Sequence, residues 1–300
     1  MKTVYQKLLA GLTCAHRIDE PLARHTSFRI GGPADLMLLP KDEPELAAAL
    51  RAIKRAKLAL LVLGNGTNML VSDRGFRGVV IKLSKGFKDI ERCGNTLRVN
   101  AALSLPRLVT RCMQQRLTGM EWAVGIPGSI GGALVMNAGA YGGQMSDVVK
   151  NVYGYLPNGD LRTPAPKDIH FSYRHAEYPK GFVIAGCTLK LRPGSKQAIK
   201  RAMDRWLTKR AQNQPLSLPS AGCIFKNPPD DSARRLIGVA GLKGKQVGGA
   251  QVSAKHANFI VNRGGARARD VLALAKAVQD AVKRDSGVTL VPEVRLIGQR

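Results

Sequence analysis

Short apolar runs that end in glycine dominate the first two thirds of the chain. Leu58 to Leu63 is such a run, and Gly64-Asn65-Gly66 stops it, which is typical of a strand followed by a tight turn. Gly78 to Leu83 is rich in β-branched residues, and polar and apolar residues roughly alternate from Thr96 to Leu103. With Phe182 to Leu191, these segments predict four strands.

Apolar residues at helical spacing become frequent towards the C-terminus. Ser104, an acceptable N-cap followed by Pro106, already predicts one helix that runs to about Leu117. Ser195 to Asn213 and Ala268 to Lys283 are amphipathic and predict two more helices.

The remaining C-terminal segments predict short strands and a boundary. His256 to Asn262 and Val291 to Ile297 read as strands, and Pro215 to Pro219 ends the helix before it. Three hundred residues are enough for two domains with sizeable cores. We therefore expect a mixed α+β architecture in two parts, residues 1–193 (subdomains of about 1–83 and 84–193) and residues 194–300.

The charge balance is strongly basic. Lysine and arginine number 47 against 21 acidic residues, a formal net charge of +26, which attracts polyanions. The cations are scattered, however, and the densest runs lie in helix-like stretches. Neither an aromatic RNA-binding strand nor zinc-finger spacing occurs. The pattern favours solvated basic helix faces, leaves a site for phosphorylated small molecules open, and makes nucleic acid the least supported partner.

The cysteines and histidines indicate the redox compartment and whether a metal site is expected. The five cysteines are far apart with no C-x-x-C pair, which fits a reducing compartment rather than disulfides or structural zinc. The five histidines show no metal-ligand spacing, so we expect no metal. No stretch approaches the roughly 20 apolar residues that span a membrane, so we expect a cytoplasmic protein without membrane insertion.

Two glycine clusters are the strongest local signals. Gly125 to Gly132 holds four glycines and a proline in eight residues, so its amide donors should lie bare for a pyrophosphate. Gly64 to Asn68 follows a strand and supplies further donors. Such clusters are also common in purely structural turns. Neither a G-x-G-x-x-G helix start nor a G-x-x-x-x-G-K-[ST] loop occurs.

Several motifs together resemble one family, the UDP-N-acetylenolpyruvoylglucosamine reductases. The resemblance covers Arg24 to Ile297 and rests on the order and spacing of six blocks rather than on any single one. The blocks are Thr26 to Gly32, Leu63 to Asn68, Gly125 to Gly132 with Asn137 to Gly142, Tyr173-Arg174, Pro219 to Pro228, and Pro292 to Arg295.

The resemblance implies a fold and a cofactor. Residues 1–193 would form an FAD-binding part of the vanillyl-alcohol-oxidase type, and residues 194–300 a C-terminal α/β substrate domain. The short interval from Arg174 to Cys223 resembles the subclass that lacks a tyrosine-bearing substrate loop. Non-covalent FAD would be held by Gly64, Asn65, Gly66, Thr67, Asn68, Gly125, Pro127, Gly128, Ser129, Gly131, Gly132, Asn137 and Ala138.

The resemblance also implies the reaction and three catalytic residues. NADPH would supply a hydride by way of FAD to the enolpyruvyl ether of a UDP-sugar, giving UDP-N-acetylmuramate for the bacterial cell wall. Arg174 would stabilise the carboxylate and the developing enolate, since a guanidinium binds a carboxylate bidentately. Glu293 would assist as a neutral acid or through water. A salt-bridge arginine and a capping glutamate are the structural alternatives.

Cys223 departs from the family's commonest pattern, which has serine as the proton donor. A thiol gives up its proton more readily than an alcohol because its ordinary pKa, about 8.5, is far lower. The cost is sensitivity to oxidation and alkylation. Outside its motif, Cys223 would read as a small buried hydrophobe.

The substrate set and the competing hypotheses complete the expectations. Tyr173, Arg210, Lys226, Asn227, His256 and Asn258 are the candidate contacts to the sugar nucleotide. We expect a monomer whose partners are this small molecule and NADPH. An oxidase of the same FAD-binding superfamily with another substrate, and a non-catalytic nucleic-acid- or anion-binding protein, remain as alternatives.

Overall fold

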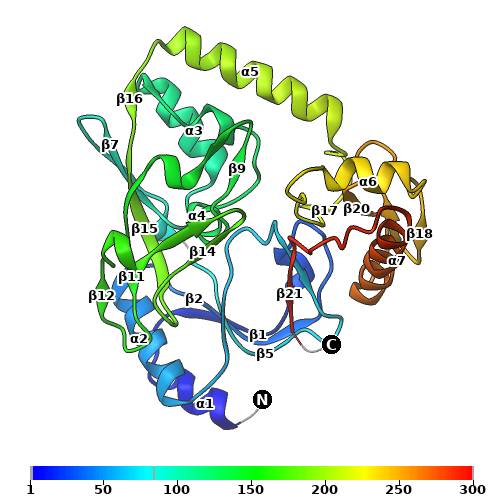
Figure 1. The fold of residues 1–300 in the computed structure, drawn as a ribbon. Helices are drawn as coiled ribbons and strands as arrows, with labels where there is room; N and C mark the ends of the chain where they lie inside the picture. Colours follow the sequence, from blue (N-terminus) through cyan, green and yellow to red (C-terminus); the bar gives the residue numbers. More distant parts are fainter. Residues whose placement is uncertain (1–2, 84, 299–300) are drawn as a thin grey trace. The chain divides into compact units, whose positions relative to one another are not determined.

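The computed structural model describes residues 3–83 and 85–298 and divides into two compact units (Figure 1). Unit 1 comprises Met1–Ile18, Leu36–Asn65 and Gly78–Lys209. Unit 2 comprises Asp19–Asp35, Gly66–Arg77 and Arg210–Arg300. Neither unit is continuous in sequence, and the domain boundary expected after residue 193 stays a prediction.

The largest sheet of unit 1 is antiparallel and has five strands in the order β12-β11-β15-β7-β6. Leu97, Val99, Val152 and Leu189 on its strands are fully buried, and they belong to the unit's main apolar core. The strands are β6 (Ile90–Cys93), β7 (Thr96–Asn100), β11 (Val149–Tyr155), β12 (Leu161–Arg162) and β15 (Val183–Lys190).

A second sheet has the order β1-β2-β5-β3, and β3 and β5 pair in parallel. Helix α2 begins after Asp42, whose side chain accepts a hydrogen bond from the Glu45 amide and so caps the helix. The elements are α1 (Thr3–Leu9), β1 (Ala15–Pro21), β2 (Pro33–Leu39), α2 (Glu43–Arg55), β3 (Leu60–Val62) and β5 (Phe76–Ile81).

Three helices and several short elements complete unit 1, and the last turn of α5, from Arg210, belongs to unit 2. Helix α3 (Leu105–Gln114) follows Ser104 and has Pro106 in its first turn, as the sequence predicted. The others are α4 (Ile130–Val135), α5 (Lys196–Asn213), η2 (Lys85–Phe87), η3 (Glu121–Ala123), η4 (Met145–Asp147), η5 (Pro166–Asp168), β8 (Leu117–Thr118), β9 (Gly139–Ala140), β10 (Gly143–Gln144), β13 (His170–Ser172), β14 (His175–Glu177) and β16 (Arg192–Pro193).

Unit 2 packs helix α7 on a small antiparallel sheet ordered β17-β20-β19-β18, and α6 packs against α7; these elements are drawn in yellow to red in Figure 1. Phe28, Ile30 and Leu70, which come from early parts of the chain, are buried in its core. The elements are η1 (Leu22–His25), β4 (Met69–Val71), β17 (Ser220–Cys223), α6 (Ala233–Val239), β18 (Gln246–Val247), β19 (Ala250–Val252), β20 (Phe259–Asn262), α7 (Ala268–Ser286) and β21 (Arg295–Ile297).

The predicted α+β class and the predicted helices and internal strands are confirmed, with two corrections at the C-terminal strands. The strand expected from His256 begins only at Phe259, because the Ser253 hydroxyl accepts hydrogen bonds from the Lys255 and His256 amides and holds a turn there. The strand expected from Val291 begins at Arg295, since Pro292 has no amide hydrogen to donate.

Candidate active site

Gly64, the first residue of the first glycine cluster, meets the second cluster in unit 1. A Cβ added to Gly64 would overlap the Ser129 hydroxyl oxygen, so the backbone of the first cluster lies directly against the second. Ser129 is buried and caps α4, since its hydroxyl accepts a hydrogen bond from the Gly132 amide. A side chain larger than hydrogen at Gly64 would therefore disturb this cap.

The free amide donors lie in the first cluster. Among residues 3–83 and 85–298, the backbone N–H groups from Gly64 to Thr67 donate no hydrogen bond to another residue. The expectation of bare amides is wrong for much of the second cluster. The amides of Gly128 and of Ile130 to Ala133 donate to acceptors within unit 1. Gly128, Gly132 and Ala133 donate within the loop and the first turn of α4, whereas Ile130 and Gly131 donate to the carbonyls of Leu103 and Ala101.

Asn137 organises the loop that follows α4. Its backbone has a φ of 38° and its side chain is buried. The carboxamide donates to the Ser172 carbonyl (3.1 Å) and to the Gln144 side chain (3.2 Å), and accepts from the Ser146 amide (3.0 Å). Its side chain is therefore occupied by protein partners, while Ala138, the next predicted cofactor residue, donates its amide to the Ala133 carbonyl.

Arg174 lies in the two-residue turn between β13 and β14. Its φ of 56° is in the left-handed region that suits such a turn. Arg174 Nη1 donates a 2.6 Å hydrogen bond to the Gly139 carbonyl, which ties the turn to the loop after Asn137. Tyr173 is 53 % exposed, and the Arg174 guanidinium carbon lies 5.5 Å from its ring centroid. The Asn137–Gly139 segment thus supports the hairpin that carries the candidate arginine.

Cys223 is the last residue of β17 and follows a β-bulge. Ser220 lies opposite Val261 and Cys223 opposite Phe259, so two residues of β17 face one residue of β20. Gly222, within the bulge, has a φ of 78°, which only glycine adopts without strain. Bulges re-aim the side chains that follow them. The half-buried thiol owes its direction to this irregularity.

Glu293 lies beside the residue that follows Cys223. Its amide donates a 2.8 Å hydrogen bond to the Ile224 carbonyl. Asn68 Nδ2 donates to the Glu293 carbonyl over 3.3 Å. Unit 2 therefore brings the backbones of Cys223 and Glu293 together. Asn68, which the sequence predicted to bind cofactor, helps to hold Glu293.

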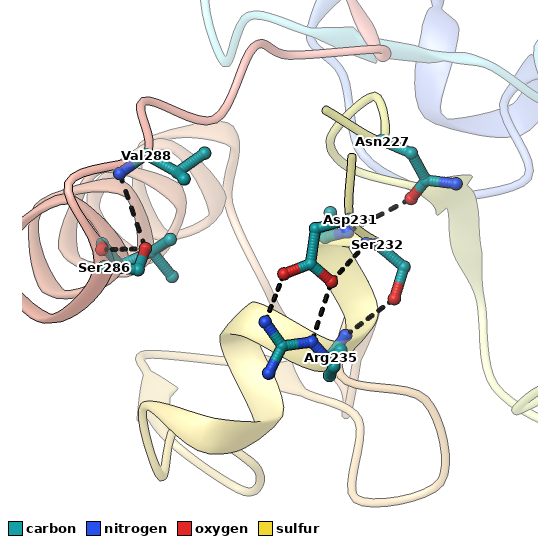
Figure 2. A network of polar contacts seen from close by, with 8 residues as sticks. Asn227, Asp231, Ser232, Arg235, Ser286 and Val288 are labelled. Atoms are coloured by element: carbon teal, nitrogen blue, oxygen red, sulfur yellow. Dashed lines mark hydrogen bonds and ion pairs between the residues drawn. The ribbon is translucent and has the colours of Figure 1, made fainter. Parts of the chain in front are cut away.

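Asn227 starts a polar network on the loop before α6 (Figure 2). Its carboxamide oxygen accepts from the Ala233 amide over 3.1 Å, and Ser232 caps the helix. The Asp231 carboxylate accepts from the Arg235 guanidinium and the Ser232 amide, and these bonds lower the Asp231 pKa to about 2.

The two cations predicted to contact substrate both precede that network in the chain. Arg210 is half-buried near the end of α5. Lys226 donates its amide to the Val291 carbonyl, and its ammonium forms no ion pair with any residue of the described ranges.

His256 and Asn258 occupy the turn before β20. The His256 ring lies edge-on to Phe259, with ring centroids 4.8 Å apart, and its Nδ1 is buried with no partner among the described residues. Burial, assisted by the positive charge of Arg234, lowers the His256 pKa to about 4. Asn258 is 2 % exposed, and its carboxamide hydrogen-bonds to both backbone groups of Phe225.

The cysteines separate into two kinds. Burial raises the pKa of Cys112 to about 12 and also raises the pKa values of Cys187 and Cys14. Cys93 is exposed and Cys223 is half-buried.

Over residues 3–83 and 85–298, no cluster of three His, Cys, Asp or Glu side chains could hold a metal ion, and no helix is long and apolar enough to cross a membrane.

Family comparisons cover nearly the whole chain. Residues 34–163 match the profile of an FAD binding domain, and residues 214–297 match the C-terminal domain of UDP-N-acetylenolpyruvoylglucosamine reductase. A reductase of that name from Symbiobacterium thermophilum is 46 % identical over 94 % of this chain and 92 % of the relative. The chain belongs to the UDP-N-acetylenolpyruvoylglucosamine reductase family.

Solved structures agree with this reductase family. The UDP-N-acetylenolpyruvylglucosamine reductase of Thermus caldophilus is 36 % identical, covers 95 % of this chain and 99 % of its own, and superimposes with a TM-score of 0.83. A berberine bridge enzyme variant aligns with 64 % of this chain at 15 % identity and a TM-score of 0.50, a likeness of fold alone. The expected vanillyl-alcohol-oxidase-type fold with a separate C-terminal domain is confirmed.

The residues present fit the FAD that this reductase family's first domain implies. The bare amides from Gly64 to Thr67 are donors for a pyrophosphate, and a Cβ at Gly64 or Gly66 would overlap a neighbouring oxygen. Sequence reasoning gave no role to Ser27, whose hydroxyl donates a 2.6 Å hydrogen bond to the Ser220 carbonyl at the start of β17. Its position in the Thr26 to Gly32 block was the available signal.

Proposed function

We propose that this protein reduces the enolpyruvyl ether of UDP-N-acetylglucosamine to UDP-N-acetylmuramate, with non-covalent FAD and with NADPH as hydride donor. The observation that carries the proposal is the alignment of 93–94 % of the chain with relatives named for this reductase activity. The backbone geometry supports it, because Glu293 pairs with Ile224, the residue that follows the candidate acid Cys223, in unit 2.

The glycine clusters bind the cofactor. Bound FAD supplies the hydride that adds to the enolpyruvyl methylene carbon. The four bare amides of the first cluster bind its pyrophosphate, and Ser129 lies against Gly64, the first of them. The predicted set is completed by Asn68, Gly125, Pro127, Gly128, Gly131, Gly132, Asn137 and Ala138.

Three side chains act on the substrate. When the methylene carbon takes up hydride, negative charge develops on the carbon that bears the carboxylate. Arg174 stabilises this charge as an enolate, and Glu293 assists. The Cys223 thiol then gives its proton to that carbon, and the thiolate is reprotonated from water.

The substrate is held mainly by cations and aromatic groups. Lys226 and Arg210 bind the diphosphate, for which one or two cations are enough. Tyr173, Asn227 and His256 contact the remainder, and the buried Nδ1 of His256 is a hydrogen-bonding group without a protein partner in the described ranges. Asn227 uses its amide group, since its oxygen already accepts from Ala233.

Anaerobic flavin spectroscopy tests the proposal. We expect the protein to take up FAD, NADPH to bleach the flavin, and the enolpyruvyl substrate to restore its colour while gaining two hydrogens by mass spectrometry. UDP-N-acetylglucosamine, which lacks the enolpyruvyl group, is the control and should leave the flavin bleached. Failure to bind FAD would overturn the proposal. Rapid reaction of the bleached flavin with oxygen, without reaction with substrate, would indicate an oxidase.

The cytoplasmic location, the monomeric state and the division into residues 1–193 and 194–300 stay predictions. Fractionation of producing cells and light scattering of the purified protein would test the first two.

A further inference from the structure

Asn258 is joined to the segment after Cys223 by three hydrogen bonds. The Phe225 amide donates to Asn258 Oδ1 over 3.0 Å, and Asn258 Nδ2 donates to the Phe225 carbonyl over 2.8 Å. The Ile224 amide donates to the Asn258 backbone carbonyl over 2.9 Å. Because Asn258 is only 2 % exposed, these bonds occupy its carboxamide and are shielded from water.

The side chain of Asn258 takes the place of a strand ladder. Strand β17 ends at Cys223, so Ile224 and Phe225 have no neighbouring strand residues on that side. A carboxamide offers one acceptor and one donor side by side, which matches the N–H and C=O of a single residue. Aspartate or serine would supply only part of this pairing.

The same segment is held from its other edge. Glu293 donates its amide to the Ile224 carbonyl, and Lys226 donates its amide to the Val291 carbonyl over 2.8 Å. Phe225 also forms an isolated β-bridge with Pro292. Residues 224–226 are therefore fixed between Asn258 on one side and the segment that carries Glu293 on the other.

The turn that carries Asn258 is itself rigid. The Ser253 hydroxyl accepts from the Lys255 amide (3.1 Å) and the His256 amide (3.2 Å). The Ser253 amide donates to the Phe259 carbonyl over 2.8 Å, and Ser253 is 4 % exposed. A side chain can position a neighbouring segment only if its own backbone is fixed. The hydrogen bonds of Ser253 hold the turn that carries Asn258 in this way.

We infer that Asn258 is a positioning residue that fixes the Cys223–Lys226 segment and thereby sets the thiol of Cys223 relative to Glu293. It acts through Phe225 rather than by the direct substrate contact that its place in the sequence suggested. The inference rests on the proposed function only in taking Cys223 as the proton donor. The hydrogen-bonded geometry stands without it.

Two variants distinguish the two hydrogen bonds between the Asn258 side chain and the Phe225 backbone. Asn258→Ala removes both side-chain bonds, so the Phe225 amide should lose its protection from hydrogen exchange and Cys223 should be alkylated faster. Asn258→Asp keeps the acceptor for the Phe225 amide and loses the donor to its carbonyl, so amide protection should persist. Substrate turnover should fall about tenfold to a hundredfold in the alanine variant, because small misplacements of reacting groups have effects of that size. Flavin reduction by NADPH should not change.

Asn262→Ala is the matched control. Asn262 is also buried in unit 2, and its side chain makes three hydrogen bonds, to the Phe28 carbonyl and the Gly264 and Ala266 amides. This change should lower stability without altering the alkylation rate of Cys223 or the protection of Phe225. The inference is overturned if Asn258→Ala leaves both readouts unchanged, or if Asn262→Ala changes them equally.

The proton-donor role of Cys223 is tested separately from the positioning role of Asn258. If Cys223→Ala turns over substrate normally, the proton-donor role fails, while the exchange of the Phe225 amide still decides whether Asn258 holds the segment. Should Asn258→Ala not fold, Asn258→Asp decides through turnover and alkylation: unchanged values would contradict the inference.

Discussion

The amide of Glu293 donates a hydrogen bond to the carbonyl of Ile224, 2.8 Å away, directly after Cys223 in the chain. The spacing of the two candidate catalytic residues is therefore set by backbone pairing within unit 2. A thiol on a short side chain has little reach of its own. The proposed reaction thus depends on how firmly this backbone is held.

Replacing Cys223 should separate the two half-reactions. In Cys223→Ala, NADPH should still bleach the flavin, while substrate turnover falls roughly 10²- to 10⁴-fold, the usual contribution of a general acid. Cys223→Ser should retain substantial activity, since a hydroxyl can carry the same proton. Stopped-flow absorbance measures both steps. An equal loss in both would assign Cys223 a structural role.

Alkylation should distinguish the five thiols. At neutral pH we expect iodoacetamide to label Cys93 and Cys223, because both are accessible and reaction requires the thiolate. Cys14, Cys112 and Cys187 should remain unlabelled in the folded protein, since burial raises their pKa values. Peptide mass spectrometry gives the rates. Cys93→Ser is the control, and its activity should be lost to iodoacetamide as fast as that of the unmodified chain.

His256 should make the protein less stable in mild acid. Its pKa is lowered from 6.5 to about 4 in the folded chain, so below pH 6.5 the unfolded chain takes up a proton that the folded chain refuses. The contribution of His256 to the free energy of unfolding is complete above pH 6.5 and declines as the pH falls towards 4. Urea unfolding at several pH values should show this decline, and His256→Asn should reduce it.

An exposed histidine provides the comparison for that experiment. His170 lies on β13 and is exposed, so His170→Asn replaces a histidine without removing a buried ring and serves as the control. If the decline survives unchanged in His256→Asn, another group is responsible.

Gly64→Ala should weaken FAD binding through Ser129. The added methyl group would overlap the Ser129 hydroxyl and displace it from the Gly132 amide, which disturbs the loop next to the bare donors. Ser129→Ala alone should cost about 1 kcal/mol of stability as a lost N-cap. Because both changes act on one contact, the double variant should lose less than the sum. FAD titration and thermal unfolding measure the effects.

The control for this cycle is Gly11→Ala, since a Cβ there meets nothing within 4 Å. It should bind FAD like the unmodified protein. Strictly additive losses in the double variant would show that Gly64 and Ser129 are not coupled.

Asp73→Ala should destabilise unit 2. The Asp73 carboxylate accepts from the Ala268 amide (2.7 Å) and the Arg269 amide (3.1 Å), and so caps the start of α7 from a distant loop. Loss of such a cap costs about 0.5–2 kcal/mol. Denaturant unfolding measures it. Asp230→Ala, at an exposed carboxylate with no hydrogen bond in the described ranges, should have no effect.

The sequence predicted those parts of the fold that depend on local pattern. The amphipathic helices α5 and α7 were predicted within one to three residues of their observed ends, because apolar spacing decides them. The carboxamide contacts of Asn227 and Asn258 were not foreseen. Both side chains bind backbone groups that are distant in sequence or set by a turn, and such pairing leaves no periodic signal. The Ser27–Ser220 contact joins residues 193 positions apart and was equally hidden.

The discontinuity of unit 2 limits how the protein can be divided. Phe28, Ile30 and Leu70 complete its core, and Asp73 caps its longest helix, yet all four precede Arg210 in the chain by more than a hundred residues. A gene fragment that encodes only the C-terminal segment would produce a protein that lacks part of this apolar core. Any chimaera that exchanges unit 2 between relatives must therefore transplant three separate stretches of coding sequence, not one.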